Sequence, residues 1–84
     1  MRHVDAFFTD EFRKQMRKIK DTATLDRLRK AIESILLNPE KGKDLHGYLA
    51  GKQSVRITPF RIVFEQKAGG VLFCTFEHRK WVYR

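Results

Sequence analysis

Two closely spaced arginines are the first chemical clue in this chain. Arg56 and Arg61 flank the dipeptide Thr58-Pro59, in a stretch where apolar and polar residues alternate. If Thr58-Pro59 forms the tip between two strands, Arg56 pairs with Arg61 and both guanidiniums lie on one face of the sheet. Like charges directly opposite each other destabilise a strand pair, whereas two guanidiniums about 5 Å apart suit a phosphate held between them. The pair therefore predicts an anion site; the alternative is that one arginine is simply paired with Glu65 or Glu77.

The closing run, residues 77–84, brings further chemistry together. His78 is a candidate acid–base group by residue type, and Tyr83 can exchange a proton beside cations. Trp81 either stacks on a base or covers the edge of the core. Positive charge in this run comes from Arg79, Lys80 and Arg84. We therefore interpret the run as a source of acid–base groups that follows the strands of the arginine pair.

Other chemistries are disfavoured by the residue types and their spacing. The histidines His3, His46 and His78 are too scattered for a metal site, and no carboxylate cluster accompanies them. Cys74, the single cysteine, is expected to be a buried small hydrophobe rather than a nucleophile. No nucleophile elbow, phosphate loop or pair of catalytic carboxylates is present. We expect no metal, no cofactor and no small-molecule ligand.

The overall charge indicates an anionic partner. The 84 residues include 18 Lys and Arg against 10 Asp and Glu, a net charge of +8, of which residues 45–84 carry +5. Such a field attracts nucleic acid, an anionic membrane face or an acidic protein; the alternative is that the charge only aids solubility. A hydrophobic content of 42% excludes a disordered chain. The longest apolar run, Val71 to Cys74, is far too short for a membrane helix.

The elements that would carry these groups follow from periodicity. Arg2 to Phe8 is predicted to form a strand, and Thr9 caps a helix with an apolar stripe that includes Phe12 and Met16. A second helix is expected from Leu25 until Asn38-Pro39, after a polar break at residues 21–24. Three strands then follow, with the last turn at Gly69-Gly70 and a last strand from Val71 to Glu77 in which Cys74 shares a face with Leu72 and Phe76. The predicted fold class is α+β, a helical hairpin packed on one face of a small antiparallel β-sheet in the order βααβββ, as one domain over residues 1–84.

The first helix is unusually basic. Arg13 with Arg17, and Lys14 with Lys18, are like-charge pairs four residues apart, each of which costs a few tenths of a kcal/mol in an isolated helix. Helix stability alone does not select them, so this basic face is a candidate for contact with an anionic partner. The alternative is an ordinary solvated face.

Several motifs, in their order and spacing, resemble the RelE/ParE toxin superfamily. They are Asp44-Leu45-His46-Gly47, Val55-Arg56-Ile57, the stretch from Phe60 to Phe64, His78-Arg79 and Val82-Tyr83. The similarity covers nearly the whole chain. It implies a helical hairpin on a small antiparallel sheet, and a toxin of a type II toxin–antitoxin system. RelE-like members are metal-independent endoribonucleases that cleave mRNA on the ribosome through attack by the RNA's own 2′-hydroxyl, and so inhibit translation.

The resemblance assigns roles residue by residue. Arg61 matches the arginine that stabilises the pentavalent phosphate, and Arg56 matches a basic strand position that neutralises developing charge. Arg79 matches a basic residue near the leaving group. Tyr83 matches a proposed general base, and His78 matches a histidine that is a candidate acid or base in other branches.

The resemblance also implies partners and a compartment. We expect mRNA on the ribosome, a cognate acidic antitoxin that covers the basic surface, no membrane, and a cytoplasmic location, which the single cysteine also favours. Expected RNA contacts outside the catalytic group are Lys52, Lys80, Arg84, Lys14, Arg17 and Lys18.

Two departures from the family pattern keep alternatives open. Ser54 stands where many RelE members have a second basic residue, for which Lys52 could substitute, and the chain ends without the C-terminal helix of some members. The ParE branch shares the fold but inhibits DNA gyrase. A catalytically weak homologue that acts as a binding module is the remaining alternative.

Overall fold

The computed structural model describes residues 4–78. The strands are β1 (Asp5–Phe8), β2 (Lys43–Asp44), β3 (Gln53–Ile57), β4 (Phe60–Lys67) and β5 (Gly70–His78). The helices are α1 (Asp10–Arg17) and α2 (Thr22–Leu37), with short 3₁₀ turns η1 (Pro39–Lys41) and η2 (Gly47–Leu49). Within the described residues, neither α-helix is long and apolar enough to cross a membrane.

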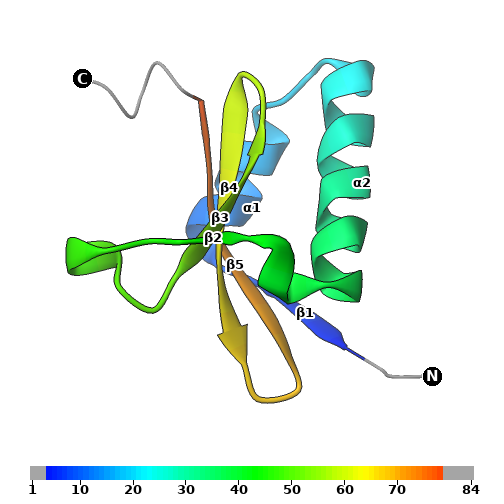
Figure 1. Ribbon diagram of the computed structural model, residues 1–84. Helices are drawn as coiled ribbons and strands as arrows, with labels where there is room; N and C mark the ends of the chain where they lie inside the picture. Colours follow the sequence, from blue (N-terminus) through cyan, green and yellow to red (C-terminus); the bar gives the residue numbers. More distant parts are fainter. Residues whose placement is uncertain (1–3, 79–84) are drawn as a thin grey trace.

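The strands form one sheet in the order β1-β5-β4-β3-β2, with both helices on one side of it (Figure 1). The pairs β2–β3, β3–β4 and β4–β5 are antiparallel, whereas β1 runs parallel to β5 at one edge. The α+β prediction, a helical hairpin packed on one face in the order βααβββ, is confirmed. The structure adds the two-residue strand β2 and the parallel edge pair.

Side-chain caps set where both helices begin. The Thr9 hydroxyl accepts the Phe12 amide at 3.1 Å and starts α1, as predicted. The Asp21 carboxylate accepts the Thr24 amide at 3.2 Å and the Thr24 hydroxyl at 2.6 Å. The expectation that residues 21–24 form a break was therefore wrong in extent, because capping by Asp21 lets α2 begin at Thr22.

The core lies between the helices and the sheet. Phe12 of α1 is fully buried, and its ring lies 5.5 Å from that of Phe8 and 5.7 Å from that of Phe73. The buried cluster comprises Phe12, Leu28, Ile35, Ile62, Phe64, Val71, Phe73 and Phe76. Full burial of one such side chain contributes about 1.5–3 kcal/mol to the free energy of unfolding. This cluster therefore holds the helices against the sheet.

The β4–β5 hairpin differs from its prediction in two respects. The turn tip is Ala68-Gly69 rather than Gly69-Gly70, because Gly69 takes the positive φ of +77° while Gly70 already belongs to β5. A Cβ on Gly70 would collide with the backbone carbonyl of Asp5 in β1. This glycine is therefore required by the close approach of two strands.

A bulge in β5 is the second difference. Val63 lies opposite Thr75 and Phe64 opposite Phe73, so Cys74 is an extra residue on β5. Beyond the bulge the faces change: Leu72 lies opposite Glu65, whereas Phe76 lies opposite Ile62 in the core. The prediction that Cys74 shares a face with both Leu72 and Phe76 was wrong, because a regular alternation does not survive an inserted residue.

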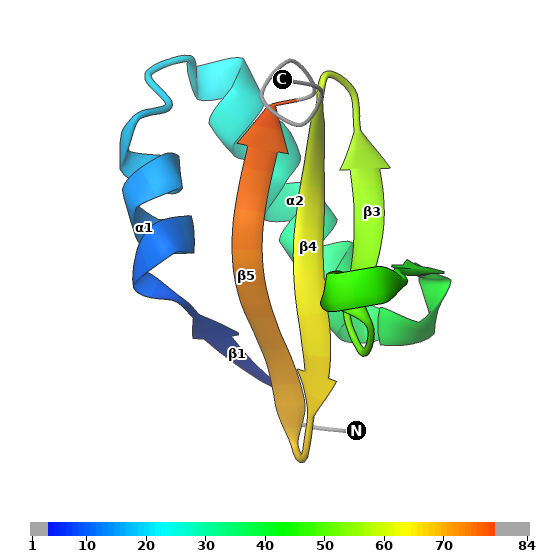
Figure 2. The same ribbon diagram turned by 90° about the vertical axis from the view of Figure 1, so that its left-hand side faces the viewer.

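The segment from Leu45 to Lys52, here called the flap, stands on the side of the sheet away from the helices (Figures 1 and 2). Its base is closed by the Leu45 amide, which donates to the Lys52 carbonyl at 3.0 Å. Gly47 and Gly51 have φ values of +69° and +91°, which L side chains rarely adopt. The flap is therefore a closed loop of defined shape rather than a loose connection.

Candidate functional site

The predicted arginine pair forms as expected. Arg56 of β3 lies directly opposite Arg61 of β4, next to the turn at Thr58-Pro59, whose peptide bond is cis. On the other side of Arg61, Glu77 of β5 is its direct partner. Arg56, Arg61 and Glu77 therefore form one row across three strands, which we call the charged row.

The strand register also shows which face of the sheet carries the charged row. Directly paired residues project on the same side of a sheet, and the neighbouring pair, Ile62 with Phe76, faces the core. The charged row thus lies on the other face of the sheet, away from the helices, which we call the open face. Figure 2 views the sheet from this side.

Arg61 is partly neutralised within this row. Its Nη2 lies 3.6 Å from Oε2 of Glu77, and the Thr75 hydroxyl donates to Oε1 of the same carboxylate at 2.9 Å. The Nε of Arg61 is buried and has no hydrogen-bond partner among the described residues. A buried N–H without an acceptor is costly, so this nitrogen would gain from an incoming oxygen.

Arg56 differs from its neighbour because its side chain is exposed and has no ion-pair partner within residues 4–78. The alternative considered from the sequence, one arginine paired with Glu77, is therefore realised for Arg61 alone. The side chains of the Arg61–Glu77 pair are 29% and 28% exposed, and at 3.6 Å their contact is too long for a strong hydrogen bond, so an incoming anion can replace the carboxylate. The row keeps one uncompensated cation and one donor available for an anion.

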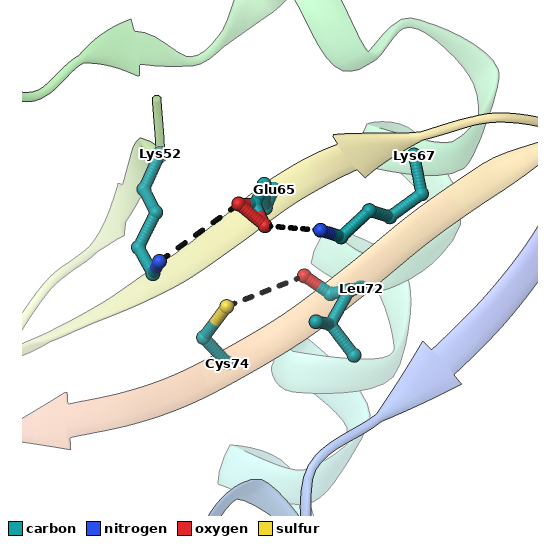
Figure 3. Close-up of polar contacts among 5 residues, drawn as sticks. All are labelled: Lys52, Glu65, Lys67, Leu72 and Cys74. Atoms are coloured by element: carbon teal, nitrogen blue, oxygen red, sulfur yellow. Dashed lines mark hydrogen bonds and ion pairs between the residues drawn. The ribbon is translucent and has the colours of Figure 1, made fainter. Parts of the chain in front are cut away.

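Further along the open face, Glu65 lies between two lysines (Figure 3). Its carboxylate is 2.7 Å from Nζ of Lys67 and 3.9 Å from Nζ of Lys52. The hydrogen bond from Lys67, followed by the positive charges of Lys67 and Lys52, lowers the pKa of Glu65 below its usual value. Lys52 directly precedes β3, and because side chains alternate along a strand it lies on the same face as Ser54 and Arg56. Lys52 therefore supplies a cation beside Ser54, as the sequence suggested it could.

Cys74 lies beside this cluster, with its Sγ 3.7 Å from the carbonyl oxygen of Leu72 (Figure 3). Burial raises the pKa of the Cys74 thiol above its usual value. A thiol that stays protonated at neutral pH is a poor nucleophile. Cys74 is only partly buried, so the expectation of a buried small hydrophobe was wrong in its burial, and its lack of a nucleophilic role stays a prediction.

The remaining candidates divide into three groups. His78 lies opposite Phe60, and its ring meets the Phe60 ring edge-on at 5.0 Å on the side of the sheet that faces the helices. The structure therefore does not bring His78 together with the charged row. The basic residues of α1, Lys14, Arg17 and Lys18, are exposed in the helical layer and form a surface separate from the open face. Four candidates lie outside the described residues, namely Arg79, Lys80, Tyr83 and Arg84.

Two features of the open face were not predicted as part of the site. The place of Glu77 beside Arg61 depends on the strand register that the Cys74 bulge creates, and no local pattern signals that bulge. Tyr48, on η2 of the flap, is 96% exposed. Its signal was available, since Tyr48 follows Gly47 in a polar connection where an aromatic residue has no core to join.

The chemistry of the open face follows from these placements. Within residues 4–78, no group of three or more His, Cys, Asp or Glu side chains could hold a metal ion. The charged row offers guanidinium donors in a fixed strand register, which suits binding of a phosphate oxygen or stabilisation of charge that develops on one.

The family of the chain follows from its sequence match. The model of the family described as the ParE toxin of type II toxin–antitoxin system, parDE, matches residues 6–83. The chain belongs to this toxin family. Its resemblance to the RelE/ParE toxin superfamily is thereby confirmed, and the protein is a toxin of the ParE family of type II toxin–antitoxin systems. None of the curated proteins matches this ParE-family toxin in sequence.

Solved structures share the fold of the toxin. The RelBE2 toxin–antitoxin complex from Mycobacterium tuberculosis matches with a TM-score of 0.81 and 24% identity, over 94% of each chain. The RelB–RelE complex from Methanococcus jannaschii matches at 0.73 and 23%, over 92% of the toxin and 94% of that chain. The YoeB–YefM complex from Staphylococcus aureus matches at 0.77 and 16%, over 89% and 95%. At these identities the likeness establishes the fold of this ParE-family toxin.

Proposed function

We propose that this toxin is a metal-independent endoribonuclease that cleaves mRNA on the ribosome, in the manner of RelE. The observation that carries the proposal is the charged row, in which Arg56 and Arg61 face each other and the buried Nε of Arg61 has no acceptor among the described residues. A fold stabilised only by its own contacts gains nothing from this arrangement. A phosphodiester between the two guanidiniums would supply the missing acceptor and offset their repulsion.

The reaction needs little from the protein besides charge and position. The RNA 2′-oxygen attacks the adjacent phosphorus, the bond from phosphorus to the 5′-oxygen breaks, and the products are a 2′,3′-cyclic phosphate and a 5′-hydroxyl. One proton leaves the 2′-hydroxyl and one reaches the departing 5′-oxygen. Preorganised cations at the developing charge contribute about 100- to 1,000-fold each, and proton transfer about 100- to 10,000-fold.

The positions of Arg61 and Arg56 support their proposed roles, whereas the roles of Tyr83 and Arg79 are proposed from the family resemblance alone. Arg61 stabilises the pentavalent phosphate, and Arg56 neutralises charge on its other side. Tyr83 and Arg79 remain proposed as general base and as the cation near the leaving group. His78 faces the helical side, so we propose it as the less favoured candidate for proton transfer.

An antitoxin partner is part of the same proposal. A groove of about 240 Å³ opens between the two helices, and its lining is apolar except for Arg29 and Glu33. The exposed basic residues of α1 lie in the same layer. An acidic amphipathic antitoxin segment would bury its apolar side in this groove and meet the basic side chains. Copurification after co-expression with a neighbouring acidic reading frame tests this partner.

Inhibition of DNA gyrase is the second candidate function, and the match to the ParE family model favours it. It requires no phosphate-binding site on the open face. Supercoiling by gyrase in the presence of the purified toxin therefore separates the two candidates.

The deciding experiment adds purified toxin to translating ribosomes and maps the RNA ends. We expect cuts with cyclic phosphate termini and no effect on supercoiling. Loss of cutting in Arg61→Ala, with activity kept in Lys20→Ala, would support the assignment, since Lys20 is an exposed cation in the connection between the two helices, away from the open face. Full activity after Arg61→Ala together with Tyr83→Phe would overturn it, and gyrase inhibition without RNA cleavage would select the second candidate.

A further inference from the structure

The flap carries an aromatic side chain that the fold does not use. Tyr48 is 96% exposed, so nearly the whole ring is open to solvent. Two other large apolar side chains of the described residues are exposed: Leu37 at the end of α2, and Phe7 in the edge strand β1. Of the three, Tyr48 alone is held on a loop that stands over the open face, where the charged row lies (Figure 2).

The loop that holds Tyr48 is built to hold one shape. Inside its closed base, the Leu49 amide donates to the His46 carbonyl at 3.3 Å and the Ala50 amide to the Gly47 carbonyl at 3.0 Å. The Lys52 amide donates to the Leu49 carbonyl at 3.0 Å. With Gly47 at a positive φ, these bonds fix the backbone on both sides of Tyr48. The backbone that carries the ring therefore loses little conformational freedom on binding.

The charge of the open face favours a nucleic acid over a protein as the partner that binds beside Tyr48. Cations lead from the flap toward the charged row. Lys52 lies at the base of the flap, Arg56 lies about 13 Å further along the chain at the rise of a β-strand, and Arg61 lies beside Arg56. Because Glu65 and Glu77 are shared among Lys52, Lys67 and Arg61, the face keeps an excess of positive charge. An aromatic ring beside a line of cations is the arrangement by which proteins bind single strands, with bases stacked on the ring and phosphates on the cations.

We infer that Tyr48 is a stacking platform for one unpaired base of a single-stranded RNA whose phosphates follow Lys52 to the Arg56–Arg61 pair. The inference rests on the proposed ribonuclease function and adds a base-binding position to it. Stacking on the ring requires a π face and no particular base, so the platform fixes the path of the strand rather than its sequence.

The experiment measures binding of a fluorescent 2′-O-methyl oligoribonucleotide, which lacks the attacking hydroxyl and stays intact, at salt concentrations from about 50 to 200 mM. We expect Tyr48→Ala to weaken binding by about 5- to 150-fold at every salt concentration. Arg56→Ala should instead reduce the slope of log affinity against log salt by about 0.7, as expected when one cation no longer neutralises a phosphate of a single strand. Leu37→Ala, at an exposed apolar site outside the flap, should bind as the wild type does.

Two replacements separate stacking from other roles of the ring. Tyr48→Phe keeps the π face and should retain affinity, whereas Tyr48→Leu keeps an apolar surface and should weaken binding as much as Tyr48→Ala does. Binding by Tyr48→Leu equal to that of Tyr48→Phe would overturn the stacking platform in favour of a general apolar contact.

Failure of the inference and failure of the proposed function give different results. If Tyr48→Ala binds the probe like the wild type while Arg56→Ala does not, the platform is wrong and the phosphate site stands. If the wild type cuts RNA on ribosomes but does not bind the probe, the platform is again wrong and the ribonuclease assignment stands. If the wild type neither binds nor cuts, both are wrong.

Discussion

Replacement of Arg56 by glutamine should make the protein more stable and less active at once. In the free toxin, Arg56 faces Arg61 across the β3–β4 pair and has no carboxylate partner within residues 4–78. Two unit charges about 5 Å apart repel by about 0.8 kcal/mol in water. Screening at physiological ionic strength reduces this to about 0.5 kcal/mol, which lies within the range measured for like charges on neighbouring strands.

The expected gain is measurable by thermal unfolding. A change of about 0.5 kcal/mol corresponds to a rise of about 2–4 °C in Tm for a domain of this size. The rise should shrink as salt is added, because the repulsion is screened. The same Arg56→Gln protein should cleave RNA about 100- to 1,000-fold more slowly, since it lacks a cation at the developing charge.

The matched control is Lys43→Gln. Lys43 is also an exposed cation on a strand, but the residue opposite it is Ser54, so its removal changes the net charge without relieving a facing pair. An equal rise in Tm for Lys43→Gln would show that only net charge matters. A fall in Tm for Arg56→Gln would refute the reasoning, because Arg56 would then stabilise the free toxin.

Three further variants probe the elements that carry the site. Glu65→Gln should destabilise the toxin at neutral pH, because the pKa of Glu65 is lowered in the folded state. The ionised carboxylate therefore contributes fully to the free energy of unfolding above its ordinary pKa of 4.5, and this contribution disappears as pH falls through the lowered pKa. Urea midpoints of both proteins should therefore converge at low pH, and a gap independent of pH would contradict the ion-pair explanation. Thr9→Ala should cost about 0.5–2 kcal/mol in urea unfolding, because Thr9 caps α1 and donates to the Cys74 carbonyl at 2.6 Å, whereas Thr9→Ser should cost much less. Gly70→Ala should cost about 1–3 kcal/mol through collision with the Asp5 backbone, and an unchanged midpoint would show that β1 moves away freely.

Local sequence signals were sufficient for the parts of the fold that depend on neighbouring residues. The Thr9 cap, the apolar stripe of α1 and the stop at Asn38-Pro39 each act within one or two helical turns. The facing of Arg56 and Arg61 was also predictable, since a two-residue connection at Thr58-Pro59 leaves one register for the strands it joins.

The features that were not predicted depend on contacts distant in sequence. The parallel pairing of β1 with β5 joins segments from opposite halves of the chain, and no local pattern encodes its direction. The bulge at Cys74 shifts the register of the end of β5, and this register places Glu77 directly opposite Arg61. The expectation for His78 relied on its position after the arginine strands, whereas strand alternation turns its ring toward Phe60.

The central claim, that Arg56 and Arg61 act on one phosphate, is tested most directly by a double-mutant cycle in single-turnover cleavage on ribosomes. Arg56→Ala and Arg61→Ala should each reduce the rate by about 100- to 1,000-fold. If both guanidiniums contact the same phosphate, the rate of the double variant should fall far less than the product of the two single reductions, because residues that act as a unit are not additive. Reductions that multiply as independent factors, or a rate unchanged in either single variant, would contradict a shared phosphate site.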